Sequence, residues 1–163
     1  MLLLISDANI LIDMEAGGLL LPIFSLDCTF AVPDILYHEE LEAMQSDLPH
    51  LGLLIHTMDA EDISKVLSLG KAYRVPSRND LFALILARKH GCPLLTGDRA
   101  LRKAAETESV EVKGSVWLLM EMVHQQRITA QVARAALQKM RDQGRRLPWA
   151  ESERQLAAYE SQS

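Results

Sequence analysis

Short apolar segments alternate with longer amphipathic stretches along most of the chain. Five of the apolar segments have the length and the composition of buried strands: Leu2–Ser6, Phe30–Val32, Ile55–Met58, Pro93–Thr96 and Val110–Val112. Helical patterns separate these segments. An alternation of this kind predicts an α/β fold with a mostly parallel sheet that is covered by helices on both faces.

Turn and cap residues set the expected limits of the helices. We expect a helix to begin at Pro33 and run through Met44, and another to follow an N-cap at Ser77 and stop at Gly91. The remaining helices are expected at Asn9–Gly17, at Ala60–Leu69 with a stop at Gly70, at Arg99–Ala105, and at Val116–His124 with a cap at Ser115.

The pattern changes after His124, where Thr129–Gln143 and Glu151–Tyr159 predict two helices with no strand between them. We therefore expect an α/β domain over residues 1–124 and a C-terminal helical extension over residues 125–163. The first of these two helices can gather five residues on one face: Ile128, Val132, Ala135, Ala136 and Met140. Such a face needs a cover, either a second copy in a homodimer or the chain's own domain.

Composition indicates a globular protein with a buried core, since 48% of the 163 residues are hydrophobic. No apolar stretch is long enough to span a bilayer, and Asp7 interrupts the apolar start before it could form a signal peptide. Cys28 and Cys92 lack metal-ligand spacing and are expected to be buried free thiols. These features predict a cytoplasmic protein without a membrane segment.

Charge is distributed unevenly along the chain, whose net charge is −5. Residues 1–64 contain 12 acidic residues and no Lys or Arg, whereas residues 65–163 contain all 17 basic residues and 10 acidic ones. This division could place a cation site beside a track for a polyanion. Solvated helix faces are an equally simple explanation.

Four acidic residues follow or flank the predicted strands in a way that suggests one site. Asp7 comes directly after the first strand, and Asp98 lies two residues after Pro93–Thr96. Asp80 lies in the first turn of a helix that enters from the same edge, and Glu40 projects from the second helix. Ligands of open parallel sheets bind beyond the carboxyl ends of the strands, so these four side chains could converge there.

Converging carboxylates repel one another by roughly 1 to 4 kcal/mol per pair, depending on the local dielectric. A bound divalent cation offsets this repulsion, and a set of oxygen ligands without Cys or His suits Mg²⁺ or Mn²⁺. A pair of such ions about 4 Å apart can activate water and stabilise the leaving oxygen in phosphodiester cleavage.

Each acid also has a purely structural interpretation. The segment from Ser77 to Asp80 fits a capping box, and Asp7 and Asp98 could each cap the helix that follows. Glu40 could be one acid of a solvated run. Only the combination of the four favours a metal site.

The segments that carry these acids resemble the motifs of the PIN-domain family, in order and spacing over roughly residues 1–123. The matching segments are Ser6–Ile12, Val32–Leu41, Asn79–Ala87, Leu94–Ala105, and Gly114-Ser115 followed by Leu118-Leu119. The resemblance implies a three-layer α/β/α fold and a magnesium- or manganese-dependent endoribonuclease. Many small bacterial members are VapC-like toxins that a cognate antitoxin holds inactive.

By this resemblance, the catalytic metal ligands would be Asp7, Glu40, Asp80 and Asp98. Glu40 is preferred to its neighbour Glu39 because it directly precedes a leucine. Asn9 and Thr96 would be supporting polar groups.

An acidic site that accepts RNA needs flanking cations. The nearest candidates for phosphate contacts are Arg78, Arg99 and Arg102, and Arg145 and Arg146 form a weaker second set. Two alternatives to the nuclease stay open. One is a PIN-like module that binds RNA or a protein with little or no cleavage. The other is a haloacid-dehalogenase-like phosphatase, in which a second acid commonly occupies the position of Asn9.

Overall fold

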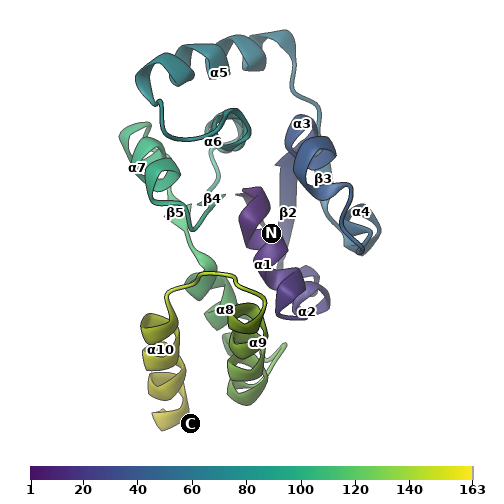
Figure 1. Ribbon diagram of the computed structural model, residues 1–163, viewed down its shortest axis with the longest axis vertical. Helices are drawn as coiled ribbons and strands as arrows, with labels where there is room; N and C mark the ends of the chain where they lie inside the picture. Colours follow the sequence, from purple (N-terminus) through teal and green to yellow (C-terminus); the bar gives the residue numbers. More distant parts are fainter. Residues whose placement is uncertain (163) are drawn as a thin grey trace.

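The computed structural model describes residues 1–162, which form an α/β fold around a five-stranded sheet (Figure 1). The strands are β1 (Leu2–Ser6), β2 (Cys28–Pro33), β3 (Leu54–His56), β4 (Leu94–Leu95) and β5 (Val112–Lys113). Their order is β3-β2-β1-β4-β5, and every neighbouring pair is parallel. The chain builds the sheet outward from β1 in both directions, so the topological switch point lies between β1 and β4.

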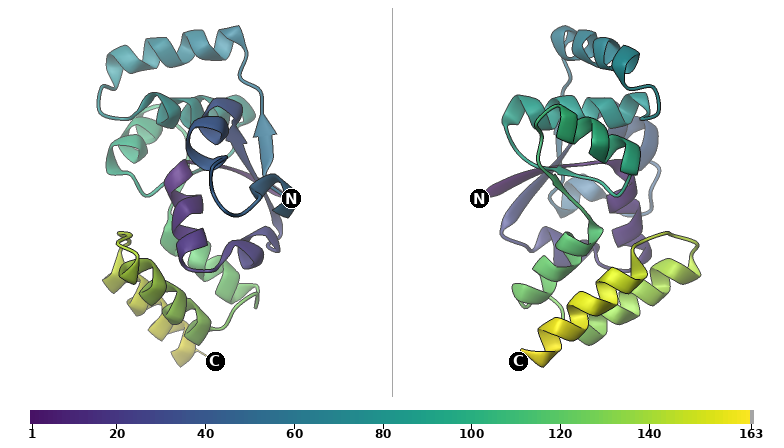
Figure 2. Two further views of the ribbon diagram at one scale, coloured as in Figure 1. Left: turned by 45° about the vertical axis from the view of Figure 1, so that its right-hand side comes forward. Right: turned by 90° about the vertical axis from the view of Figure 1, so that its left-hand side faces the viewer.

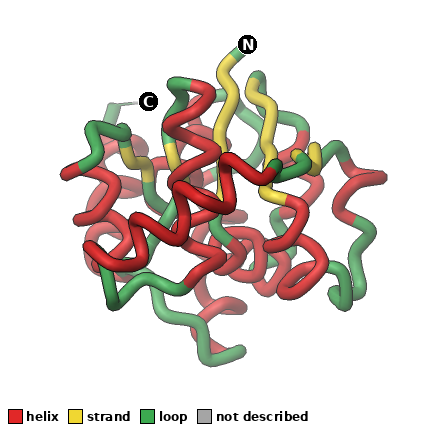
Figure 3. Tube along the Cα trace, turned by 90° about the horizontal axis from the view of Figure 1, so that it is seen from above, coloured by secondary structure: helices red, strands yellow, loops and turns green. Residues whose placement is uncertain are grey.

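Helices enclose the sheet, which gives the expected three layers (Figure 3). The helices are α1 (Ala8–Ala16), α2 (Leu20–Phe24), α3 (Asp34–Leu36), the π-helix η1 (Tyr37–Leu41), α4 (Leu48–Leu51), α5 (Ala60–Ala72), α6 (Arg78–His90), α7 (Arg99–Thr107), α8 (Ser115–His124), α9 (Ala130–Asp142) and α10 (Trp149–Ser161). Helix α6 packs on β1, β2 and β4. All seven residues from Leu81 to Ala87 are buried, so α6 is the central helix of the fold.

The structure differs from the sequence prediction at several helix ends. Gly70 does not stop α5, which continues to Ala72; a Cβ at Gly70 would lie 3.9 Å from Leu81, so this position sits in the contact between α5 and α6. The expected cap at Ser115 is wrong as well. Ser115 is the first residue of α8 and is buried, and the N-cap position belongs to Gly114, which has no side chain to bond the helix end.

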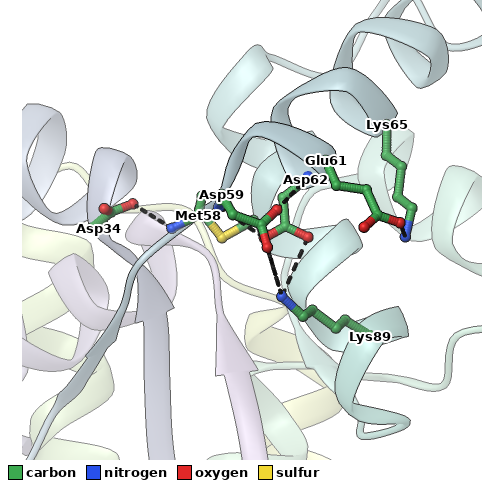
Figure 4. Close-up of polar contacts among 7 residues, drawn as sticks. All are labelled: Asp34, Met58, Asp59, Glu61, Asp62, Lys65 and Lys89. Carbon is green, nitrogen blue, oxygen red and sulfur yellow. Dashed lines mark hydrogen bonds and ion pairs between the residues drawn. The ribbon is translucent and has the colours of Figure 1, made fainter.

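Helix α5 is anchored on α6 by charged groups at its first turn (Figure 4). Asp59 and Asp62 form a capping box, and Lys89 of α6 lies 3.2 Å from Asp62 and 3.7 Å from Asp59. The backbone N–H of Met58 donates to Asp34 over 3.3 Å, which connects this turn to the end of β2. These acids therefore have structural partners of their own.

The two C-terminal helices pack on the α/β part of the chain (Figure 2). Helix α9 contacts α1 and α8, and α10 contacts α8 and α9. Of the apolar face expected on α9, Ala136 and Met140 are buried, whereas Ala135 is exposed and Val132 is 47% exposed. The chain thus covers part of this face itself, and both the homodimer and a domain boundary near residue 124 stay predictions. No helix within residues 1–162 combines the length and the hydrophobicity needed to cross a membrane.

Candidate active site

Asp7 and Asp98 lie beyond the carboxyl ends of the adjacent strands β1 and β4, at the switch point of the sheet. Each is also the N-cap of the next helix, as the structural interpretation predicts. Asp7 accepts a hydrogen bond from the backbone N–H of Ile10 at 3.0 Å, and Asp98 accepts one from Leu101 at 2.7 Å. These capping bonds fix the orientation of each carboxylate at the edge of the sheet.

Thr96 connects these two acids. Its hydroxyl donates to Oδ2 of Asp7 over 2.5 Å, and its oxygen accepts the backbone N–H of Asp98 at 3.0 Å. Thr96 and Asp7 are both buried, with 0% and 1% exposed surface, so water does not compete for these bonds. This is the kind of contact that the supporting role predicted for Thr96 requires.

Asp80 brings a third carboxylate to the same edge of the sheet. It forms a capping box with Ser77 at the start of α6, again as the structural interpretation predicts. Burial raises the pKa of Asp80, hydrogen bonds from Ser77 oppose the rise, and the charge of Asp98 adds to it. The two carboxylates are therefore close enough to interact electrostatically.

Asp7 is the most perturbed of the acids. Burial raises the pKa of Asp7 from 3.8 to about 6. Hydrogen bonds from Thr96 and Ile10 oppose this rise, and the charges of Asp80 and Asp13 reinforce it. Asp7, Asp80 and Asp98 thus form a chain of mutually repelling carboxylates, and such repulsion favours a proton or a cation among them.

The π-helix η1 presents Glu39 and Glu40 to the start of α6. Nδ2 of Asn79 donates to Glu40 over 2.9 Å, while the guanidinium of Arg78 lies 3.1 Å from Glu39. A π-turn inserts one extra residue into the helical register, and such turns are frequent at functional sites. Sequence reasoning missed Asn79, although it directly precedes Asp80. Its Oδ1 atom is buried and has no hydrogen-bond partner within residues 1–162.

A metal ion needs several of these ligands at once. Within residues 1–162, no three Asp, Glu, His or Cys side chains lie close enough to hold one ion in their present orientations. Each of the three carboxylates takes part in capping a helix: hydrogen bonds within the described chain reach both oxygens of Asp7, and Oδ2 of Asp80 and of Asp98. The oxygen-only donor set fits Mg²⁺ or Mn²⁺ chemically. The assignment of the four ligands stays a prediction.

A second cluster lies beside the acids and was not expected. Arg145, from the turn between α9 and α10, donates through Nε to Asp13 over 2.5 Å and through Nη2 to Asn9 over 3.2 Å. Burial raises the pKa of Asp13, and Arg145 opposes that rise. Asn9, predicted to support the acids, therefore bonds an arginine of the C-terminal hairpin, which consists of α9, α10 and the turn between them. The available signal was the spacing of Asn9 and Asp13, which are four residues apart on one helix face.

The three arginines predicted to contact RNA are in different situations. Arg78 is already paired with Glu39. Arg99 is exposed at the start of α7, and Arg102 is half-buried, with its guanidinium near Gly114. Neither Arg99 nor Arg102 forms an ion pair within the part of the chain that the structure describes, so both could take a phosphate without losing a partner.

A family model described as a PIN domain matches residues 3–161, which includes the C-terminal hairpin. Among solved structures, the chain is similar to a PilT N-terminus domain protein from the hyperthermophilic archaeon Sulfolobus solfataricus P2. The TM-score is 0.54 at 13% identity, over 75% of this chain and 94% of that chain. At this identity the likeness concerns the fold alone. No curated protein matches the sequence.

Proposed function

The chain belongs to the PIN-domain family, and on that premise we propose that it is a metal-dependent endoribonuclease that hydrolyses RNA phosphodiester bonds. PIN domains are generally nucleases that use divalent metal ions. Membership in this family removes the haloacid-dehalogenase-like phosphatase from consideration. The activity, the RNA substrate and the site residues are the proposal.

Burial of the Asp7 carboxylate beside Asp80 is the observation that supports the proposal most. An acid with 1% exposed surface and a pKa of about 6 is costly to keep ionised at neutral pH. A structural cap alone needs no such cost, because Asn or Ser caps a helix as well. Perturbed acids at a switch point are typical of functional sites.

The proposed ligands of Mg²⁺ or Mn²⁺ are Asp7, Glu40, Asp80 and Asp98. The ion would supply a polarised water and stabilise charge on the cleaved phosphate. Thr96 holds Asp7 in one orientation, and Asn79 holds Glu40. Arg99 and Arg102 follow Asp98 on α7 and would neutralise flanking phosphates.

The biological setting we propose is that of a VapC-like toxin, which acts on RNA in the cytoplasm until a cognate antitoxin binds it. This step rests on the resemblance of the motifs to small bacterial toxins. Induced expression should arrest growth, whereas expression of Asp98→Asn should not. Normal growth at a high level of wild-type protein would contradict the toxin assignment but not the proposed nuclease activity.

The alternative function is a module that binds RNA or protein with little cleavage. The presence of all four acids favours the enzyme. The deciding experiment incubates the protein with single-stranded RNA and Mg²⁺ or Mn²⁺, with and without EDTA. We expect cleavage that EDTA and Asp98→Asn both abolish. RNA binding without cleavage in either metal would establish the binding module instead.

A further inference from the structure

A cleft of about 440 Å³ opens beside the acids, between α1, the start of α7 and the turn between α9 and α10. Its lining includes Asn9, Asp13, Asp98, Gly144, Arg145 and Arg146. The turn reaches this place because the C-terminal hairpin lies against α1 (Figure 2). A residue of the predicted active site, Asp98, thus shares a cleft with two arginines from the far end of the chain.

The turn that carries these arginines is held firmly. Gly144 has φ +79°, a left-handed conformation that suits glycine, and the backbone N–H of Arg145 donates to Met140 over 2.9 Å. Met140 is fully buried against Gly17, where a Cβ would lie only 2.5 Å from its Cε. The helix before the turn therefore packs closely on the end of α1, and the position of the turn is set by the fold.

The two arginines of the turn have different roles. The charge of Arg145 is balanced by Asp13, whose carboxylate is 10% exposed and accepts the Nε donor at 2.5 Å. Arg146 is exposed and makes no ion pair or side-chain hydrogen bond within residues 1–162. Arg145 fixes the turn, and Arg146 gives the cleft a guanidinium that no ion pair within the described residues engages.

We infer that this cleft is a phosphate subsite, in which Arg146 holds a backbone phosphate of single-stranded RNA next to the phosphate that is cut. The inference rests on the proposed function for its ligand. A phosphate in the cleft would also lie near Asp98, which lines it, and without a cation that encounter is repulsive. Arginine suits the role because its planar guanidinium can bind two phosphate oxygens at once.

The test measures binding without cleavage. A fluorescently labelled single-stranded RNA is titrated with the protein in EDTA, and anisotropy is recorded at several salt concentrations. We expect Arg146→Ala to weaken binding about 3- to 10-fold and to lower the slope of log K against log salt by roughly 0.7 or less. Arg146→Lys should recover part of the affinity, since it keeps the charge.

Arg154→Ala is the matched control, because it removes the same charge from α10. Arg154 does not line the cleft, and its side chain is 74% exposed beside Glu151. Equal affinities and salt slopes for the two alanine variants would overturn the inference, as would a wild-type protein that binds no RNA in EDTA. Arg146 is chosen over Arg145 because loss of Arg145 would leave Asp13 buried and unpaired.

The two proposals fail in different ways. Cleavage by the wild type, together with unchanged binding by Arg146→Ala, overturns the subsite and leaves the nuclease intact. Binding that depends on Arg146, together with no cleavage in Mg²⁺ or Mn²⁺, overturns the nuclease and keeps only the contact between Arg146 and an RNA phosphate.

Discussion

The Thr96 hydroxyl donates a hydrogen bond to Oδ2 of Asp7 over 2.5 Å, although the two residues lie 89 positions apart in the sequence. This bond joins the ends of two adjacent parallel strands, β4 and β1. Because Thr96 also accepts the backbone N–H of Asp98, one buried hydroxyl fixes the spacing of two proposed metal ligands. Removing this bond by mutation therefore tests how the two proposed ligands are positioned.

Replacing Thr96 with Val removes the hydroxyl but keeps the shape of the side chain. The pKa of Asp7 should rise above about 6, because the hydrogen bond from Thr96 lowers it. The stability should fall by roughly 1–3 kcal/mol, since buried polar groups lose their partner. Carboxyl NMR titration of the metal-free protein measures the first effect and chemical denaturation the second. Thr96→Ser should restore both, and an unchanged pKa would show that this bond does not control the acid.

Replacing Asp7 with Asn should remove a pH dependence of stability. The folded-state pKa of Asp7, about 6, lies above the ordinary 3.8, so the folded protein holds the proton more tightly than the unfolded chain does. The resulting stabilisation is complete below about pH 4 and is lost as the pH rises through about 6. At about 1.4 kcal/mol per pKa unit, the loss amounts to roughly 3 kcal/mol.

Between about pH 4 and pH 7, the free energy of unfolding of the metal-free wild type should therefore fall relative to that of the Asp7→Asn variant. The same variant should lose RNA cleavage. A control replacement, Asp27→Asn, affects a side chain that is 80% exposed and should leave the wild-type pH dependence in place. Parallel curves for wild type and Asp7→Asn would contradict the raised pKa.

Glu39 and Glu40 form a natural matched pair. Glu40 contacts Asn79, next to Asp80, whereas Glu39 is neutralised by Arg78. We expect Glu40→Gln to reduce single-turnover cleavage by about 100-fold or more, as loss of a metal ligand does, and Glu39→Gln to retain most of the activity. The reverse result would show that Glu39, and not Glu40, is the metal ligand.

Arg99 and Arg102 should contribute to RNA binding electrostatically. Each alanine variant should lower the salt slope of binding by roughly one unit or less, and neither should remove metal binding. Arg78→Ala should have a smaller effect, because Arg78 is already paired with Glu39. A slope that is unchanged in an Arg99→Ala, Arg102→Ala double variant would place the RNA elsewhere.

The sequence was sufficient to predict which acids lie at the carboxyl edge of the sheet, and the reason is physical. Strands buried on both faces are strongly apolar, so the acids at Asp7 and Asp98 mark the points where the chain leaves the sheet. Caps are equally local, and the expected capping box from Ser77 to Asp80 is present. Parallel order then places the ends of the strands at one edge.

Contacts between distant segments were beyond such reasoning. Arg145 and Asp13 are 132 positions apart, and no local pattern links a basic residue after Gly144 to an acid on α1. The π-helix at Tyr37–Leu41 was missed because one inserted residue leaves no signature in hydrophobic periodicity. The periodicity of α9 also could not tell which residues of its apolar face the domain itself buries, because the close packing of Met140 on Gly17 selects them.

The central claim is that the acids at the switch point bind a divalent cation, although their present orientations serve helix ends. Titration of Mn²⁺ into the metal-free protein by isothermal calorimetry near pH 6 tests it most directly. We predict saturable binding with release of protons, because Asp7 has a pKa of about 6 and is then partly protonated. Asp98→Asn should weaken the binding at least about 10-fold. No saturable binding by the wild type, or equal affinity in the variant, would contradict the account.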